Sequence, residues 1–502
     1  MSEVTLPNSW ANPPISDCCD LNPKLDKSQF ADGQLVHFVP MPAVEALTNK
    51  VDVSATRTFA EVKKGYTPFV SGDVLFAKIT PCMENGKMVV VPELPHGLAF
   101  GSTEFHVIRP RGGLDPLWFF YFVSSRPYRS NAEHNMTGAV GQRRVPIDFI
   151  ARSLIPLPPL AEQKRIVAKI EELFSELEAG EESLRVARRQ LGVYRQSLLK
   201  QAFEGKLTAR WRTQNPAKFE SPAQLLARIQ SARQARYEEQ LKKWASREES
   251  DNRPKQAKPR SPLPPSPLDE EVLARLPALP HGWTWAKMED TCDVVRGGSP
   301  RPAGDPMYYD GDIPFLKVAD LTRVEGPYVD NYTSTIKPAG LQKTRYVEPP
   351  VLLISNSGAT LGVPRICRIA ATFNDGVAAF LDLDPESHRF FYYFWTSKTE
   401  ALRNIDQGAA QPNLNTDLLK TYPVPVCSLP EQQEIVRLLD EQFEVIERNE
   451  REIDGALRKS EALRQAILQK AFTGRLVPQS PADEPASTLL ARLRAERQKA
   501  KS

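Results

Sequence analysis

The chain has 502 residues, of which 41% are hydrophobic and 25% charged, which excludes a wholly disordered protein. No apolar stretch approaches the roughly 20 residues that cross a bilayer, and the N-terminus lacks the segments of a secretory signal. The six cysteines form no CxxC pair and the six histidines lack metal-ligand spacing. We therefore expect a cytoplasmic protein without a structural metal.

Two blocks have the composition of folded domains. Residues 1–155 carry 15 basic and 15 acidic side chains, and residues 283–426 carry 14 and 17. Neither block shows the basic excess that is typical of a nucleic-acid binder. Charge alone therefore does not predict a DNA-binding protein.

A long helix is expected after the first block. Pro156, Pro158 and Pro159 end that block, and apolar or small residues then recur at alternating spacings of four and three from Leu160 onward. This pattern predicts a heptad seam over about 44 residues, with Gly205 as the C-terminal cap. The large aliphatic residues of the seam are Ile166, Ile170, Leu173, Leu177, Leu184, Leu191 and Leu198, and Tyr194 falls in the same series.

The segment between the helix and the second block is expected to be mostly extended. Residues 246–281 are polar and contain eight prolines, a composition that is typical of a semi-rigid spacer. We predict one short helix followed by this linker over residues 213–282.

A second long helix with the same period is expected after the second block. Its seam includes the polar residues Gln442, Asn449 and Ser460, which can fix register at some cost in stability. Gly474 stands where a C-terminal cap is expected. The large aliphatic residues of this seam are Ile435, Leu439, Ile446, Ile453, Leu463 and Ile467.

The chain contains an internal repeat. Trp10, Asp17 and Cys19 recur 273 positions later as Trp283, Asp290 and Cys292. The two long helices match at a constant shift of 269, so that the Glu-Gln pair at 162 recurs at 431. This predicts one scaffold used twice, with different surfaces.

Each long helix is expected to pair with the other one, since both seams have the same period. An internal pseudo-twofold axis favours an antiparallel pair. A parallel pair, or a coiled coil between separate chains, is the alternative.

The motifs of common enzymes are absent. There is no GxxxxGK[ST] loop, no GxGxxG after a strand, no GxSxG elbow and no HExxH helix. Residues 12–15 (NPPI) resemble the Asn-Pro-Pro-aromatic motif of amino-methyltransferases, but the fourth residue is aliphatic and the repeat places a tryptophan opposite Asn12. We expect no active site in this chain.

Several segments together resemble the specificity subunit of type I restriction-modification systems. In the second block these are residues 297–300 (GGSP), 308–315 (YYDGDIPF), 351–362 (VLLISNSGATLG), 408–414 (GAAQPNL) and 429–432 (LPEQ). In the first block they are residues 72–78 (GDVLFAK) and 156–163 (PLPPLAEQ), followed after the helix by 205–208 (GKLT) with Trp211. The resemblance covers nearly the whole chain. The sequence departs from the family pattern at Pro349-Pro350 and at residues 138–143 (GAVGQR). These departures concern the details of the recognition loops, and the resemblance to the family is unaffected.

The resemblance implies a DNA sequence-specificity subunit that is not itself catalytic. Each block is then a target recognition domain that reads one half of an asymmetric, two-part sequence in double-stranded DNA. The helices act as a spacer and dock two modification subunits, which hold S-adenosylmethionine and methylate adenine at N6. Restriction subunits that use ATP and Mg²⁺ join the complex, which lies in the cytoplasm of a bacterium or archaeon.

The predicted fold class is α+β: two tandem mixed α/β target recognition domains separated by two long helices in an antiparallel coiled coil, with an internal pseudo-twofold repeat. The predicted boundaries are residues 1–155 for the first recognition domain, 156–212 for the first spacer helix, 213–282 for the short helix and linker, 283–426 for the second recognition domain, 427–477 for the second spacer helix and 478–502 for a tail helix.

Two loops in each block are candidates for reading bases, because Arg favours guanine edges and Asn or Gln favours adenine edges. Each loop follows a predicted strand or a glycine. The candidate residues are Lys78, Thr80, Asn85, Lys87, Gln142, Arg143 and Arg144 in the first block, and Asn356, Ser357, Thr360, Arg365, Gln411, Asn413 and Asn415 in the second.

Two other functions compete with this interpretation. The chain can be a coiled-coil scaffold that holds two modules unrelated to DNA, or a self-sufficient DNA methyltransferase. The missing cofactor loop disfavours the methyltransferase.

Overall fold

The computed structural model describes residues 6–139, 141–216, 220–248, 258–259, 261–358, 360–404 and 414–499. The chain forms two compact units, Met1–Val186 with Glu452–Ser502, and Ala187–Arg451. Each unit contains one recognition domain and one half of the long-helix pair.

Domain 1 is built on two small sheets. The first is antiparallel and has the strand order β1 (Cys19–Leu21), β8 (Phe105–Pro110), β5 (Val74–Ala77), β6 (Met88–Val90). The second has the order β3 (Thr56–Thr58), β2 (Leu35–Val39), β7 (Ala99–Gly101), β4 (Thr67–Phe69), with β2 and β7 parallel. All four residues of β5 are buried, as expected of a strand that is covered on both faces.

Short helices cover the first sheet of domain 1. Asp115 starts α3 (Pro116–Ser124) by accepting hydrogen bonds from the backbone N–H groups of Leu117 and Trp118. Trp118 is fully buried and packs with Val74 and Phe76 of β5. The other helices here are α1 (Ile15–Cys18), α4 (Arg126–His134) and α5 (Ile147–Arg152), whereas α2 (Phe59–Val62) packs on the second sheet, with Phe59 against Phe100 of β7.

Domain 2 repeats the same topology. Its first sheet has the order β10 (Asp293–Arg296), β18 (Val377–Leu381), β15 (Val351–Ser355), β16 (Pro364–Cys367), and a further edge strand, β12 (Tyr328–Val329), lies parallel to β16. Its second sheet has the order β13 (Thr335–Ile336), β11 (Tyr309–Leu316), β17 (Ala371–Phe373), β14 (Arg345–Val347), with β11 and β17 parallel. The repeat that the sequence predicted is therefore a repeat of strand order.

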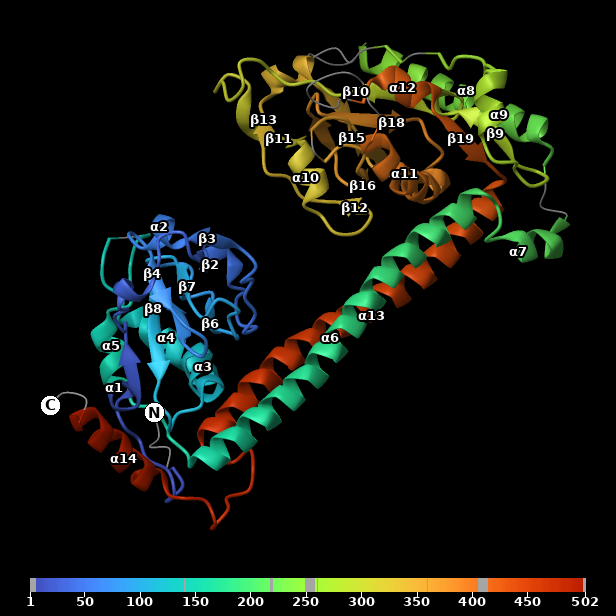
Figure 1. Ribbon diagram of the computed structural model, residues 1–502. Coiled ribbons are helices and arrows are strands. Elements are labelled where there is room, and N and C mark those ends of the chain that lie inside the picture. Colours follow the sequence, from blue (N-terminus) through green and yellow to red (C-terminus); the bar gives the residue numbers. More distant parts are fainter. Residues whose placement is uncertain are drawn as a thin grey trace. The chain divides into compact units, whose positions relative to one another are not determined.

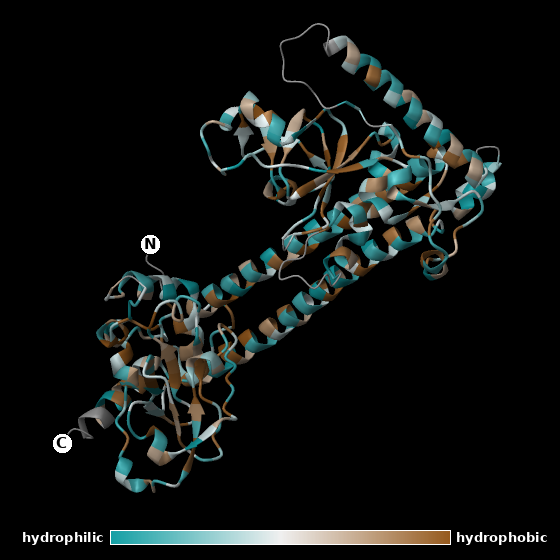
Figure 2. Cartoon of the chain, turned by 90° about the horizontal axis from the view of Figure 1, so that it is seen from above, coloured by the Kyte–Doolittle hydropathy of each residue, from teal (hydrophilic) through white to brown (hydrophobic). Residues whose placement is uncertain are grey.

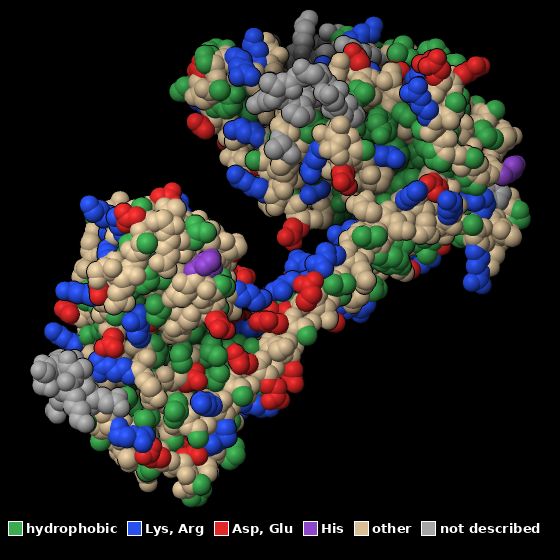
Figure 3. Space-filling model, in the orientation of Figure 1, with side chains coloured by type: hydrophobic (Ala, Val, Ile, Leu, Met, Phe, Trp, Pro, Cys, Tyr) green, Lys and Arg blue, Asp and Glu red, His purple; other side chains and the backbone are tan. Residues whose placement is uncertain are grey.

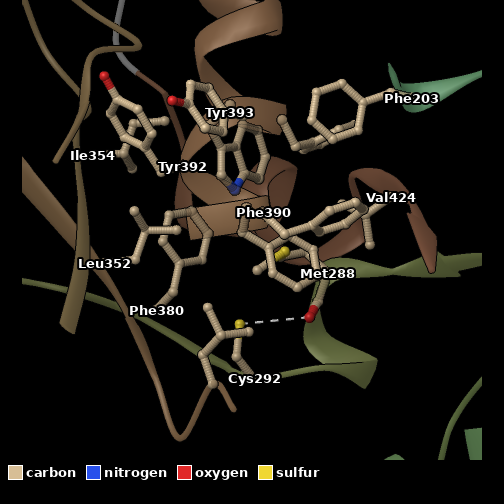
Figure 4. Close-up of a cluster of buried hydrophobic side chains, with 14 of the residues drawn as sticks. Phe203, Met288, Cys292, Leu352, Ile354, Phe380, Phe390, Tyr392, Tyr393 and Val424 are labelled. Carbon is tan, nitrogen blue, oxygen red and sulfur yellow. Dashed lines mark hydrogen bonds between the residues drawn. The ribbon is translucent and has the colours of Figure 1, made fainter. Parts of the chain in front are cut away.

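The core of domain 2 lies between its first sheet and α11 (His388–Arg403). Phe380 of β18 stacks on Trp395 of α11 with ring centroids 5.3 Å apart. Phe203, the last residue of the first long helix, enters the same core against Phe390 (Figure 4). Smaller elements complete the domain: β9 (Thr284–Lys287) pairs with β19 (Pro423–Val426), and α10 (Val318–Thr322) and α12 (Thr416–Thr421) flank the sheets. Figure 2 shows that the strands are mostly hydrophobic.

The long helices are α6 (Leu160–Phe203) and α13 (Leu429–Phe472), each of 44 residues, as predicted. They pack side by side and run antiparallel (Figure 1). The evidence is two contacts: Ser460 bonds to Glu181 in one unit, and Arg195 bonds to Glu450 in the other. Gly205 and Gly474 follow the helices with φ of +68° and +70°, which favours glycine and confirms both caps.

Most of the predicted seam lies at the interface between the two helices or against a domain. Ile166, Ile170, Leu198, Ile435, Leu439, Ile446 and Ile453 are buried, and Leu173, Leu177, Leu184, Leu191 and Ile467 are partly buried.

The prediction that Leu463 lies in the seam is wrong. Its side chain is 52% exposed, and the next residue, Arg464, faces the partner helix instead. Tyr194 is also 45% exposed, but its hydroxyl donates to Gln442 of α13 at 3.1 Å, while its neighbour Arg195 bonds to Glu450 of the same helix. A straight α-helix has 3.6 residues per turn, so a strict 3.5-residue repeat drifts by about 20° per heptad. After several heptads this drift turns the seam by one residue.

The segment 213–282 differs from the prediction of one short helix. Its main helix, α8 (Pro222–Glu248), has 27 residues, and a second helix, α9 (Glu270–Arg275), lies in the proline-rich part. Arg233 of α8 bonds to Asp293 at 2.8 Å and so holds the helix against domain 2. The tail helix α14 (Ala486–Lys499) packs on domain 1 in a comparable way, with Arg494 bonded to Asp17. A short helix, α7 (Ala209–Gln214), follows α6.

Among the residues that the structure describes, no helix is long and apolar enough to span a membrane. Within the same residues, no group of three His, Cys, Asp or Glu side chains is placed to hold a metal ion. All six cysteines are free thiols.

Candidate nucleic-acid interface

In domain 1, backbone hydrogen bonds join the two candidate loops. The Thr80 N–H donates to the Arg143 carbonyl at 3.0 Å, and the Val145 N–H donates to the Lys78 carbonyl at 2.9 Å. An isolated bridge also pairs Ile79 with Arg144. The loop after β5 and the loop before α5 are therefore one structural element.

Acidic side chains hold the arginines of this element. Arg144 forms a two-pronged ion pair with Glu104, at 2.7 and 2.9 Å, and these hydrogen bonds hold the pKa of Glu104 below its usual range. Arg143 lies 3.5 Å from Glu84, which also accepts a hydrogen bond from Thr80. Any anionic ligand of these arginines must compete with these carboxylates.

The other candidates in domain 1 lie around this element. Asn85 and Gln142 are exposed, Lys78 is half-buried, and the Lys87 ammonium donates to the Met41 carbonyl at 3.1 Å. The buried His106 supports the element from the sheet side, since its Nε2 lies 2.9 Å from the Val145 carbonyl.

In domain 2 the same two segments meet. The hairpin loop between β15 and β16 closes through Ser355, whose N–H donates to the Val363 carbonyl at 3.0 Å. Beyond it, the Leu414 N–H donates to the Asn356 carbonyl at 2.7 Å, and the Asn356 N–H donates to the Gly376 carbonyl at 2.9 Å. Asn356 is thus the junction of three segments.

The side chains at this junction are neutral. Asn356 is fully buried, and neither its Oδ1 nor its Nδ2 has a hydrogen-bond partner among the residues that the structure describes. Ser357 is half-buried and Thr360 is exposed. Asn415 is exposed and caps α12 by accepting from the Asp417 N–H at 2.9 Å. Gln411 and Asn413 lie outside the described residues.

Arg365 is placed apart from these residues. It lies on β16, and its guanidinium donates to the carbonyls of Pro364 at 2.7 Å and Val324 at 2.6 Å. Burial lowers the pKa of this guanidinium. A role in reading bases remains a prediction for Arg365, whereas its bonds to backbone are structural.

The sequence did not single out a hollow of about 540 Å³ beside the domain 2 junction. Its lining includes Arg301, Lys317, Tyr332 and Asn374, and Asp375 on its wall bonds to Ser299 at 2.6 Å. The sequence contained part of the information needed to find this hollow, because residues 297–300 and 308–315, which supply some of its lining, belong to the motifs of the resemblance. Nothing in the motifs showed that these segments would converge.

The glutamate of the repeated Glu-Gln pair bonds to neighbouring segments at the start of each long helix. The buried Glu162 of α6 accepts from the indole N–H of Trp10 in domain 1 at 3.1 Å and from Gln479. The equivalent Glu431 of α13 accepts from Thr208 at 2.7 Å and from Arg212 of α7 at 2.7 Å, and so joins α13 to the segment that follows α6. The two equivalent glutamates therefore both accept hydrogen bonds at the start of a long helix, but from different partners.

A duplicated α+β domain attached to an antiparallel helix pair defines a class of two-module recognition subunits. The family described as "Type I restriction modification DNA specificity domain" matches residues 7–185 and 280–456. The chain belongs to this family, and it is a specificity subunit with two recognition domains whose family role is DNA target recognition.

Similar proteins with a known designation are also specificity subunits. The specificity subunit of the type I restriction enzyme EcoEI of Escherichia coli is 26% identical, with 93% of this chain and 83% of the relative aligned. The EcoAI specificity subunit of the same species is 25% identical over 87% of this chain and 78% of its own. Both are specificity subunits, which fits a non-catalytic chain.

Solved structures share the fold. One, from work on assembly and conformational transition of the type I restriction-modification system, has a TM-score of 0.68 at 22% identity and covers 94% of this chain and all of its own. The HsdS subunit from Thermoanaerobacter tengcongensis has a TM-score of 0.57 at 21% identity and covers 95% of this chain and 99% of its own.

Proposed function

We propose that each recognition domain reads one half of an asymmetric, two-part DNA target through its two joined loops. One observation carries this proposal: backbone hydrogen bonds bring the same two loops together in both domains, while the side chains on them differ. A shared frame with different donors and acceptors is what two dissimilar half-sites require, because base edges are distinguished by their hydrogen-bonding groups.

The long helices serve as the spacer and as the docking surface for two modification subunits. Tyr194 and Leu463 occupy equivalent positions, 269 residues apart, and are 45% and 52% exposed. Val193 beside Tyr194 is 71% exposed. Apolar side chains repeated at equivalent places on paired helices support contacts with two copies of one partner.

The partners supply the chemistry in this proposal. Modification subunits bind S-adenosylmethionine and methylate an adenine at N6 in each half-site, which requires that base to leave the stack. Restriction subunits use ATP and Mg²⁺ to translocate and cut DNA. The near-neutral domains fit this division, because partner subunits can neutralise most phosphates. The assembled complex would act in the cytoplasm.

The test is a pair of substitutions that each affect one half-site. With the target known from methylome sequencing of a host that expresses the system, Arg143→Ala should weaken discrimination at the half-site of domain 1 only. Asn413→Ala should do the same for domain 2. A contact of this kind typically contributes about 1–3 kcal/mol of base discrimination.

Arg152→Ala, at an exposed position on α5, is the matched control for Arg143→Ala and should leave both half-sites unchanged. Equal loss at both half-sites from either loop variant would contradict the proposal. A gel shift without any binding to genomic DNA, with modification subunits present, would favour a scaffold. Binding of S-adenosylmethionine to this chain alone would favour a self-sufficient methyltransferase.

A further inference from the structure

An ionic cluster interrupts the apolar seam in the unit of domain 1. Arg464 of α13 bonds to Glu181 of α6 at 3.4 Å, and Ser460 donates to the same carboxylate at 2.6 Å. The side chains of Arg464 and Glu181 are only 18% and 15% exposed. Arg464 also lies 5.1 Å above the ring of Phe174.

The unit of domain 2 contains the same cluster. Arg195 of α6 bonds to Glu450 of α13 at 3.2 Å, and it lies 5.4 Å from the ring of Phe443. Arg195, Glu181 and Phe174 each recur 269 positions later, as Arg464, Glu450 and Phe443. The duplication therefore placed an Arg-Glu-Phe cluster on each side of the middle of the helix pair.

Each cluster also reaches the neighbouring domain. Phe174 packs edge to face on Tyr121 of α3, with ring centroids 5.8 Å apart. Phe443 packs in the same way on Tyr393 of α11, at 5.4 Å. A displacement of the helices at either cluster would therefore disturb the domain beside it.

The apolar seam of α6 is sparsely buried around these clusters. From residue 171 to residue 197, α6 has no fully buried side chain, and Gly180 is exposed. A helix in a protein gains most of its stability from packing of its apolar face, so a stretch with little buried apolar surface needs other contacts with the partner helix. Figure 3 shows side chains of both charges along the helix pair. Among these, Arg464 with Glu181 and Arg195 with Glu450 join one helix to the other.

We propose that the two Arg-Glu-Phe clusters are positioning elements that hold the centre of the helix pair closed and in register, and thereby restrict the subunit to one spacing between its half-sites. Polar groups in a helical seam fix register because a shifted pair leaves a shielded charge without its counter-ion. The inference rests on the proposed function, in which the helices act as the spacer.

The charges can be removed while the packing is kept. A variant with Arg195→Met, Glu450→Gln, Arg464→Met and Glu181→Gln retains long side chains on both Phe rings and lacks both ion pairs. The matched control carries Arg437→Met and Glu434→Gln, which removes an ion pair of 2.7 Å that lies within α13 and does not cross to α6.

The measurement is methylation of a series of targets whose half-sites are moved apart or together in single base-pair steps of about 3.4 Å. Full-length chain co-expressed with its modification subunits is used throughout. Wild type and control should methylate one spacing. In the charge-free variant, methylation at spacings one base pair longer and shorter should rise about tenfold relative to the native spacing, the order of coupling seen in such contact networks.

This ratio does not change when only the amount of folded protein falls. A folded charge-free variant with the wild-type spacing profile would overturn the inference. If that variant fails to fold, the variant with Arg464→Met and Glu181→Gln alone replaces it, and it should still broaden the spacing profile. An unchanged profile there would overturn the inference. Failure of wild type to methylate any two-part target would instead contradict the proposed function.

Discussion

The two recognition domains have the same strand order but hold their recognition loops with different chemistry. In domain 1 the loop arginines are paired with carboxylates, Arg144 with Glu104 and Arg143 with Glu84. In domain 2 the described part of the junction is neutral and centres on the buried amide of Asn356. The backbone hydrogen bonds that join the loops recur in both.

This difference shows which part of the duplicated fold was free to diverge. Backbone contacts fix where the loops lie and do not depend on side-chain identity. The side chains on the loops contribute little to the core, so they can change without loss of the fold. The same rule applies at the helix junctions, where Glu162 and Glu431 hold equivalent places with neutral and ionic partners respectively.

The largest effect is expected at that pair of glutamates. Glu431→Gln leaves the guanidinium of Arg212, which is 13% exposed, without its charged partner, and should lower the free energy of unfolding by about 3–5 kcal/mol. Burial raises the pKa of Glu162, and its two hydrogen-bond partners, Trp10 and Gln479, carry no charge. Glu162→Gln should therefore change stability by less than about 1 kcal/mol. Urea unfolding of the full chain measures both, and equal losses would contradict the comparison.

A smaller effect of opposite sign is expected at two asparagines of domain 2. Asn356→Leu removes a buried amide that has no hydrogen-bond partner in the described part of the chain, and it should raise the free energy of unfolding by about 1–3 kcal/mol. Asn415→Ala removes the cap of α12 and should lower it by about 1 kcal/mol. Thermal unfolding compares them. A loss of stability in Asn356→Leu would show that the amide is satisfied in solution.

The smallest effect concerns acidic pH in domain 1. Burial lowers the pKa of His106, despite the hydrogen bond to the Val145 carbonyl that favours its charged form. The unfolded chain therefore binds a proton more readily, and this contribution to stability is present at neutral pH and lost as the pH falls below about 6.5. Discrimination at the domain 1 half-site should weaken between pH 7 and 5.5.

His106→Gln is the control for this titration, since glutamine can donate to Val145 without taking up a proton. The repeat places an alanine, Ala379, opposite His106, so the half-site of domain 2 should respond less. An identical pH response of both half-sites would exclude His106 as the cause.

The sequence predicted the duplicated plan, the two helices, their caps and most of the seam. The family resemblance that followed from ordered motifs is confirmed, as are the antiparallel pairing and the α+β class. The assignment of Leu463 to the seam was wrong, because the drift of a straight helix accumulates over a distance that a local repeat does not register. The length of α8 was missed because its polar composition resembles a linker, and its packing on domain 2 rests on arginines such as Arg233.

Local pattern by itself determined where the two long helices begin and end and that one scaffold occurs twice, since caps, prolines and apolar spacing act over a few residues. Only the tertiary structure decided the strand orders, the joining of the two loops at Asn356 and beside Arg143, and the convergence of Arg, Glu and Phe in each half of the helix pair. These features depend on contacts between residues far apart in the chain, and no local preference encodes which distant segments will meet.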